Sequence, residues 1–346
     1  MNKRFLGISA LILLINLSLA GSGAFARNDS RQSFSVTTLG LAQDPLLVRA
    51  LYAVPSRMAG SVDPDGAVGV NRGVSSQAKF FIEKQRYGGD LVQTGLASND
   101  DTLIKTGLKV INWGFSRQGA DGSFPGTGDP FHSVSLFVEG TARALLSLSE
   151  ANRDKYGEPI TALVPKLFAA AQWLEQPEVE RRGQSNNFPY THRRWVLAAA
   201  LAETAALAHD PNMAAKAKAY ADQGLALQQA DGVNPEKDGY DVSYQAVGIL
   251  EAERYLVVCH DQTEQTQVKG MIEKACNWEI AMIGDDGQVN VGNSTRMGNE
   301  AAHSGKIKHV NTKEVLQALT YASKITGDER YRNRASLVAR AHGWLQ

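Results

Sequence analysis

The sequence is poor in several features that define whole classes of protein. It has only two cysteines, Cys259 and Cys276, too few for a disulfide scaffold, and we expect both to be buried thiols. Basic and acidic residues balance at 36 each, whereas nucleic-acid-binding proteins usually carry a basic excess, so we expect no nucleic-acid partner. Beyond residue 26 no apolar run is long enough to cross a bilayer. No sustained Val/Ile/Thr alternation occurs, so strands should be few and short.

The first 26 residues have the pattern of an export signal. The basic start MNKR precedes the apolar run FLGISALILLINLSLA, and GAFA offers a small-residue cleavage site at Ala24–Ala26. A retained membrane anchor is the alternative, but Gly21 and Gly23 interrupt the apolar run where a peptidase would need small residues. We therefore predict a signal peptide at 1–26, a periplasmic or secreted mature chain, and no membrane contact after cleavage.

An Asp-Gly pair recurs at the ends of apolar-periodic segments. Asp121 and Asp231 are separated by 110 positions, and Asp231 and Asp286 by 55, so one step of 55 residues fits both intervals. A degenerate copy ends at Gln176, one step after Asp121. Such a step suits two helices and two connections. The aspartates themselves are most simply turn residues.

Apolar residues at three- and four-residue spacings predict a succession of helical hairpins. The predicted helices span 133–151, 160–176, 192–208, 212–229, 243–258, 265–283, 312–325 and 329–345. Links at one end, such as 209–212 and 326–329, are short, whereas 119–132, 177–192, 230–241 and 285–311 are long and polar. An open superhelix and a closed ring are both possible, and this asymmetry favours the ring. We predict an all-α fold, an incomplete (α/α) toroid over 98–346, preceded by an N-terminal extension at 27–97 that supplies a lid and first helices.

Polar and titratable residues follow each long connection. They are His132 and Glu139 after the first; Asn187, Tyr190, His192, Arg193 and Arg194 at the second; Tyr240 and Tyr244 after the third; and Asn293 and Arg296 within the fourth. In a ring, these groups would converge on one pit. Tyr240 and Tyr244 should share a helix face. Of the adjacent arginines, we expect one at the pit and the other on solvated surface.

This mixture of side chains favours one kind of chemistry. Glycoside hydrolysis usually needs two facing carboxylates, and a metal site needs His, Asp, Glu or Cys at ligand spacings; neither dominates here. Histidine, tyrosine, asparagine and arginine suit β-elimination on an acidic sugar. Arginine or amide groups neutralise the carboxylate, a base removes the neighbouring proton, and an acid protonates the leaving oxygen. This chemistry requires no metal and no organic cofactor.

Three motifs, NNFPYTHRRW, GYDVSYQ and GNSTRMGN, make the chain resemble the α/α-toroid polysaccharide lyases, which cleave alginate, glucuronan and similar polyuronates. The resemblance covers about 98–346 and implies an anionic polysaccharide substrate. It implies that Asn187 and His192 act on the carboxylate and proton, Tyr244 is the catalytic tyrosine, and Arg296 holds the substrate. Tyr190 and Tyr240 remain rivals of Tyr244. The remaining polar residues of the long connections would bind substrate: Tyr190, Arg193, Arg194, His132, Glu139 and Asn293.

Simpler roles and other functions stay open for the same residues. Asn187 could only cap the helix that starts near Tyr190, and His192 could be a packed histidine. A glycoside hydrolase on this scaffold would use Asp121, Glu139 or Asp231 as acid and base. A carbohydrate-binding protein without catalysis would use the same pit for affinity alone.

Overall fold

The computed structural model describes residues 59–75, 78–302 and 305–345, all of which belong to one unit spanning 34–346. The predicted signal peptide at 1–26 and much of the N-terminal extension lie outside the described residues. Within those ranges ten α-helices and two short 3₁₀ helices form, with no β-strand. The all-α prediction is therefore confirmed.

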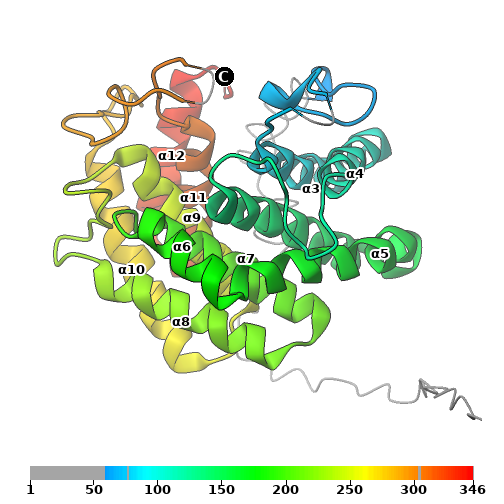
Figure 1. Ribbon diagram of the computed structural model, residues 1–346. Helices are drawn as coiled ribbons and strands as arrows, with labels where there is room; N and C mark the ends of the chain where they lie inside the picture. The colour runs from blue at the N-terminus through cyan, green and yellow to red at the C-terminus, as the bar shows by residue number, and fades with distance from the viewer. Residues whose placement is uncertain (1–58, 76–77, 303–304, 346) are drawn as a thin grey trace, which may run out of the picture. The chain divides into compact units, whose positions relative to one another are not determined.

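The elements follow one another along the chain with short or long connections between them (Figure 1). They are η1 (Gly69–Asn71), η2 (Ile82–Arg86), α3 (Tyr87–Ser98), α4 (Asp101–Phe115), α5 (Pro130–Glu175), α6 (Pro177–Asn187), α7 (His192–Ala208), α8 (Pro211–Leu227), α9 (Val242–Val258), α10 (Gln262–Ala281), α11 (Thr312–Thr326) and α12 (Glu329–Ala341).

Most predicted helices form close to their expected bounds. The helix predicted at 192–208 is α7, and the one predicted at 243–258 is α9 with one extra residue. Two predicted helices, 133–151 and 160–176, are the halves of α5, which is interrupted by non-helical backbone at Asn152. The Asn152 side chain accepts the Lys155 amide at 2.9 Å, so it caps the second half.

One sequence expectation about an irregular segment was wrong. The connection at 177–192 is not a loop throughout, because α6 occupies its first eleven residues. Pro177 at the start and Glu178 and Glu180 in the first turn favour a helix terminus there, yet the segment has no apolar stripe that reveals it. α3 lies at the end of the predicted N-terminal extension.

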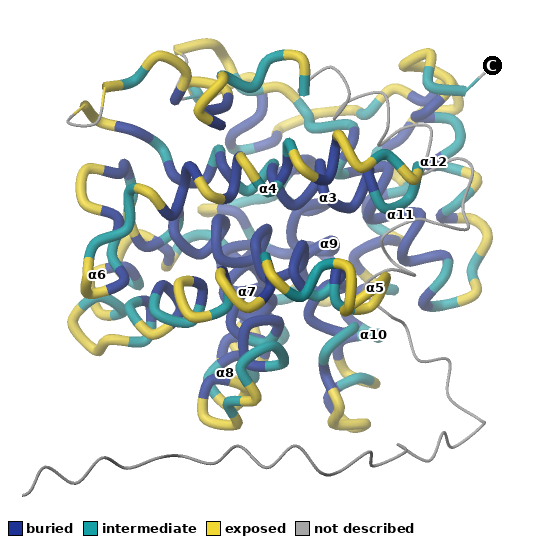
Figure 2. Tube along the Cα trace, turned by 90° about the vertical axis from the view of Figure 1, so that its right-hand side faces the viewer, coloured by how far each residue is buried: buried dark blue, intermediate teal, exposed yellow. Residues whose placement is uncertain are grey.

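The helices pack in a repeating order. α5 contacts α7, α7 contacts α9 and α9 contacts α11, while α4, α8, α10 and α12 each pack on their sequence neighbours α3, α7, α9 and α11. Figure 2 shows α7 and α9 buried along most of their length, whereas α8 shows exposed turns. Two ion pairs link α11 to the start of the helical series: Lys313 to Asp90 of α3 at 2.6 Å and Glu314 to Arg86 of η2 at 3.3 Å.

The repeated Asp-Gly pairs are turns, as predicted. Asp121, Asp231 and Asp286 each accept, through Oδ1, the amide of the residue two positions on, at 3.0–3.1 Å. The glycine after each has φ between 78° and 95°, a conformation that glycine adopts without steric cost. The same turn therefore follows a helix in three of the four repeats.

The cysteines also match the expectation, since Cys259 and Cys276 are both buried and free. In the part of the chain that the structure describes, no helix has the length and apolarity to span a bilayer.

Candidate functional site

His192 is the first residue of α7 and is only 1% exposed. Glu236, from the long connection between α8 and α9, contacts both the backbone amide and the imidazole of His192. Glu236 Oε1 accepts the His192 amide at 3.0 Å and lies 2.7 Å from His192 Nδ1. Because Nδ1 is engaged by the carboxyl group, the ring is fixed and Nε2 points the other way.

Aromatic rings and a guanidinium stack around this imidazole. The Tyr244 ring, in the first turn of α9, has its centroid 4.5 Å from that of His192. The Arg296 guanidinium lies over the rings of Tyr244 and Tyr190, 3.8 Å and 4.7 Å from their centroids. The His132 ring, at the start of α5, is 5.7 Å from His192 in an edge-on arrangement. Residues from three helices and two connections thus meet at one place.

Further charged groups surround the stack. Arg193 donates to Asn187 Oδ1 at 2.9 Å and pairs with Asp129 at 3.0 Å. Glu300 accepts from Arg296 at 2.9 Å and from Lys308 at 2.8 Å, and also binds Lys237. Below, "the His192 cluster" denotes the following residues: His132, Tyr190, His192, Arg193, Glu236, Tyr244, Arg296, Glu300 and Lys308.

Burial and positive charge set the protonation of the cluster. Burial, followed by the charges of Arg296 and Arg193, holds the pKa of His192 well below its ordinary value. Burial and Arg193 do the same to the pKa of His132. Burial raises the pKa of Glu236 to about 8, although the His192 amide and the arginines oppose this. Near neutral pH, neither imidazole carries a charge of its own on these grounds.

The pKa of Glu300 is lowered, whereas that of Glu236 is raised. Burial raises it, but hydrogen bonds from Lys237, Lys308 and Arg296 outweigh this and lower the pKa to about 2. Glu300 therefore carries a negative charge that three cations share. The three positive charges outnumber the one negative charge, so the part of the cluster around Glu300 is suited to an anion.

Several buried polar atoms of the cluster have no hydrogen-bond partner within the described residues. They are His192 Nε2, His132 Nδ1, Arg193 Nε, Arg296 Nη1 and Glu236 Oε2. Arg296 Nη1 and Glu236 Oε2 lie 3.8 Å from each other, beyond hydrogen-bond length. Unpaired buried groups are uncommon and call for an explanation. One explanation is a bound ligand that supplies the missing hydrogen-bond partners.

Three sequence expectations about individual residues are corrected. Asn187 does not cap α7, since it ends α6 and the capping position of α7 is Thr191. Arg194 is not solvated surface: it is buried and donates to the backbone carbonyls of Asn187, Phe188 and Tyr190. Arg194 thus fixes the backbone that leads into the site.

Tyr240 and Tyr244 do not share a helix face, because α9 begins after Asp241. The Tyr240 ring packs on Trp278 at 5.1 Å, and its hydroxyl accepts the amide of Asn293 at 3.0 Å. Tyr240 and Asn293 therefore contact each other, whereas Tyr244 contacts His192.

Glu139 belongs to another buried group of charges. It pairs with Arg143 at 2.7 Å and Arg254 at 3.1 Å, and Arg254 also pairs with Glu251 at 2.7 Å. All four side chains are buried, which suits a structural ion-pair network between α5 and α9. Of the predicted substrate-binding residues, His132, Tyr190, Arg193 and Arg296 lie in the His192 cluster.

Reasoning from the sequence missed Glu236, Glu300 and Lys308. All three lie in the long connections that were expected to carry the site, and this location was the only signal for them in the sequence. Their side chains are common on loops, and only the fold shows that they meet His192 and Arg296.

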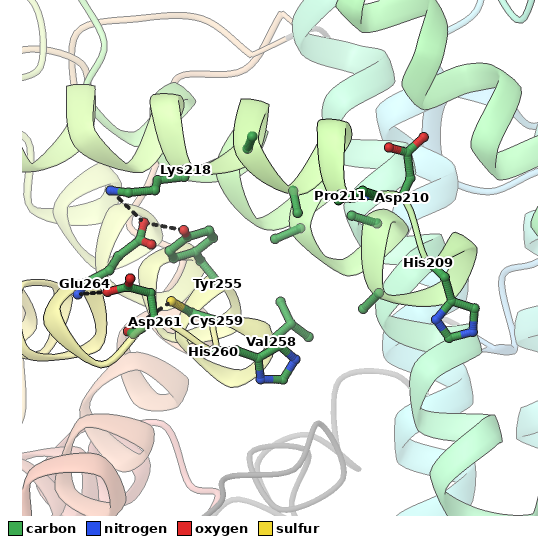
Figure 3. A pocket seen from close by; sticks show the side chains of 15 residues that line it. His209, Asp210, Pro211, Lys218, Tyr255, Val258, Cys259, His260, Asp261 and Glu264 are labelled. Carbon is green, nitrogen blue, oxygen red and sulfur yellow. Dashed lines mark hydrogen bonds and ion pairs between the residues drawn. The ribbon is translucent and has the colours of Figure 1, made fainter. Parts of the chain in front are cut away.

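Two cavities lie away from the cluster. One, of about 440 Å³, lies between the α7–α8 and α9–α10 turns, at the opposite end of α7 from His192. Figure 3 shows Lys218 and Tyr255 converging on Glu264 there. The other, of about 530 Å³, runs along α4 between Lys105 and Arg117.

No family model, no curated protein and no solved structure matches the chain. Functional inference therefore depends on the geometry of the site and the resemblance in sequence motifs.

Proposed function

We propose that this chain is a polysaccharide lyase that cleaves a uronic-acid polymer, of alginate or glucuronan type, by β-elimination. One observation carries the proposal. A buried imidazole nitrogen without a partner, a tyrosine ring and a guanidinium nitrogen without a partner meet within the His192 cluster. This is the set of groups that the reaction needs: a base, an acid and an anion-binding cation.

An incomplete (α/α) toroid is the scaffold that we propose. In support, the inner helices α5, α7, α9 and α11 contact one another in chain order, each with an outer partner. The Lys313–Asp90 and Arg86–Glu314 pairs connect the last of them to the beginning of the helical series. The first residues of α7 and α9 carry His192 and Tyr244, as expected if the long connections supply the site.

In the proposed reaction, Arg296 Nη1 binds the carboxylate of the sugar and offsets the negative charge that develops beside it. His192 Nε2 takes the proton from the carbon that bears the carboxylate. The electron pair of that C–H bond forms a double bond to the adjacent carbon, whose bond to the glycosidic oxygen breaks. The Tyr244 hydroxyl donates its proton to the leaving oxygen, and the proton on His192 restores the hydroxyl. When ionised, Glu236 orients the imidazole and stabilises its charged form.

The charges of the cluster support an anionic substrate. Lys237, Arg296 and Lys308 share the single carboxylate of Glu300. Since burial keeps Glu236 largely protonated near neutral pH, it offsets little of this excess. A polymer with one carboxylate per sugar would meet both Arg296 Nη1 and the surrounding positive field.

The carboxylates that a glycoside hydrolase would use are occupied otherwise. Asp121 and Asp231 accept the amides of their own turns, and Glu139 pairs with two arginines. A non-catalytic binder would use the same cluster, and only an assay of turnover separates it from an enzyme.

The test is a panel of polyuronates, including alginate and glucuronan, followed by absorbance of the new conjugated double bond and by a reducing-end assay. A lyase produces both signals. Reducing ends without the absorbance would identify a hydrolase. Saturable binding with neither signal would identify a binding protein and reject the proposal.

A further inference from the structure

Asp241 connects two parts of the candidate site through one side chain. It is fully buried and immediately precedes α9. Its Oδ1 accepts the amides of Ser243 and Tyr244, each at 3.1 Å. Its Oδ2 accepts the amides of Arg296 at 2.9 Å and Met297 at 2.8 Å. One carboxylate thus satisfies four backbone donors on two segments that are more than fifty positions apart.

We propose that Asp241 is a positioning residue, which holds the backbone of Arg296 against the first turn of α9 and so fixes the stack of Arg296 on Tyr244. This inference rests on the proposed function for its effect on turnover. Asp241 itself takes no part in proton transfer. Its role is to keep the guanidinium 3.8 Å from the Tyr244 ring centroid, where both groups can meet one sugar.

The hydrogen bonds of Asp241 hold the amide of Arg296, whereas the neighbouring hydrogen bonds hold other residues of the same connection. Thr295 also donates its amide to the Tyr240 carbonyl at 2.9 Å, and Ser294 Oγ accepts the Val242 amide at 3.3 Å. Those bonds keep the connection near α9. The amide of Arg296 itself, however, bonds to Asp241 Oδ2. Arg296 and Met297 are buried, so loss of this acceptor leaves two donors unpaired or forces the backbone to move.

Asp210 provides a matched control. It caps α8 with the same chemistry, accepting the amides of Asn212 at 2.9 Å and Met213 at 3.1 Å through Oδ1. Both bonds stay within its own helix, far along α7 from His192. Replacing either aspartate by serine retains a good helix cap, but a single hydroxyl oxygen cannot serve both α9 and the amides of Arg296 and Met297.

The experiment compares Asp241→Ser with Asp210→Ser in the full chain. Three quantities are measured: the melting temperature, hydrogen exchange at the amides of Arg296 and Met297, and kcat and KM on the polyuronate that the parent cleaves. We expect both variants to lose only a few degrees of melting temperature. In Asp241→Ser alone, exchange at the two amides should quicken by about tenfold or more, and KM should rise about tenfold as Arg296 loses its position. Partial unfolding would lower kcat without raising KM.

Slow exchange at both amides together with unchanged kcat and KM in Asp241→Ser would overturn the inference. Equal losses in both variants would also overturn it, since they would show a cap effect alone. If Asp241→Ser does not fold, Asp241→Asn, which keeps one acceptor oxygen, is measured in the same way. If the parent cleaves no polyuronate, the proposed function fails, and the exchange rates still decide whether Asp241 holds the Arg296 backbone.

Discussion

The rate of elimination should rise with pH in a step that belongs to the Glu236–His192 pair. Below the step, Glu236 is protonated and its Oε1 donates the proton to His192 Nδ1, 2.7 Å away, which leaves the imidazole proton on Nε2. If the shared proton moves from Glu236 to His192 Nδ1, the pair still holds the same number of protons, so both forms belong to one titration state. In both forms Nε2 already bears a proton and cannot act as a base.

Above the step, the pair has lost one proton. Nδ1–H then donates to the Glu236 carboxylate, and Nε2 presents a lone pair to the substrate. Because the pKa of Glu236 is raised to about 8, the competent fraction is about 9% one pH unit below and about 90% one unit above. The rate should therefore increase by about tenfold across these two pH units.

Glu236→Gln tests this origin of the step. The amide oxygen can accept both the His192 amide and Nδ1–H, so Nε2 stays free at every pH in the range, and the step should disappear. The plateau rate should fall by roughly one to two orders of magnitude, because no negative charge then stabilises the imidazolium. Glu300→Gln is the matched control: the pKa of Glu300 is lowered to about 2, so this variant should retain the step.

The assay is kcat at saturating polyuronate, followed by double-bond absorbance from about two pH units below to two above the step. The rings of Tyr190, Tyr244 and His132 contact His192, and the pKa of His132 is also lowered. The cations Arg86, Arg193, Arg296 and Lys308 act on His192 through their charge. The guanidinium groups do not titrate in this range. A flat profile in the parent, or an unchanged step in Glu236→Gln, would refute the assignment of His192 as the base.

Three further predictions concern turnover and stability. His192→Ala and Tyr244→Phe should each lower elimination by roughly 10²–10⁴-fold while circular dichroism stays unchanged. Glu253→Gln should stabilise the fold increasingly above the ordinary carboxyl pKa, as melting temperatures at a series of pH values will show. Burial raises the pKa of Glu253, so the folded state holds a proton that the unfolded state releases, and stability falls as pH rises. Lys313→Met, which leaves the buried Asp90 without its 2.6 Å partner, should cost about 3 kcal/mol in denaturant unfolding.

Each of these has a control and a contrary result. Tyr240→Phe removes a hydroxyl outside the His192 cluster and should keep turnover, and equal loss in both tyrosine variants would remove Tyr244 from the mechanism. A constant stability gain of Glu253→Gln at all pH values would contradict the linkage. Lys155→Met breaks an exposed pair with Asp101 and should cost little free energy of unfolding. A similar cost for Lys313→Met would show that its buried pair contributes little.

Periodicity in the sequence could predict the elements that bury an apolar stripe. α7 and α9 were found within a residue because seven of the thirteen buried residues of α7 and seven of the fourteen of α9 are alanine, leucine, valine or isoleucine. The Asp-Gly turns were predictable because aspartate accepts a nearby amide and glycine adopts positive φ. Local chemistry determines these features, and local sequence therefore reveals them.

The site depends on contacts between segments that lie far apart, and these were only partly predictable. The residues at the start of α7 were identified, but the partner of His192 is Glu236, 44 positions on. Arg194 could not be told from Arg193, because both are charged and adjacent; only the fold shows that one holds backbone carbonyls and the other faces Tyr190. α6 lacked a signal because its helix buries little apolar surface.

The start of α7 shows how closely structure and proposed chemistry are joined. Thr191, at the capping position, uses its hydroxyl to bond the Pro235 carbonyl instead of capping the helix. The amide of His192 is satisfied by Glu236, so the group that orients the imidazole also serves the helix terminus. A carboxylate is favoured at a helix N-terminus, whereas burial favours the neutral acid. These opposed effects place the pKa of Glu236 near 8, within the range where a proton can be gained or lost during turnover. A surface glutamate would stay ionised, and a buried one away from the helix start would stay protonated.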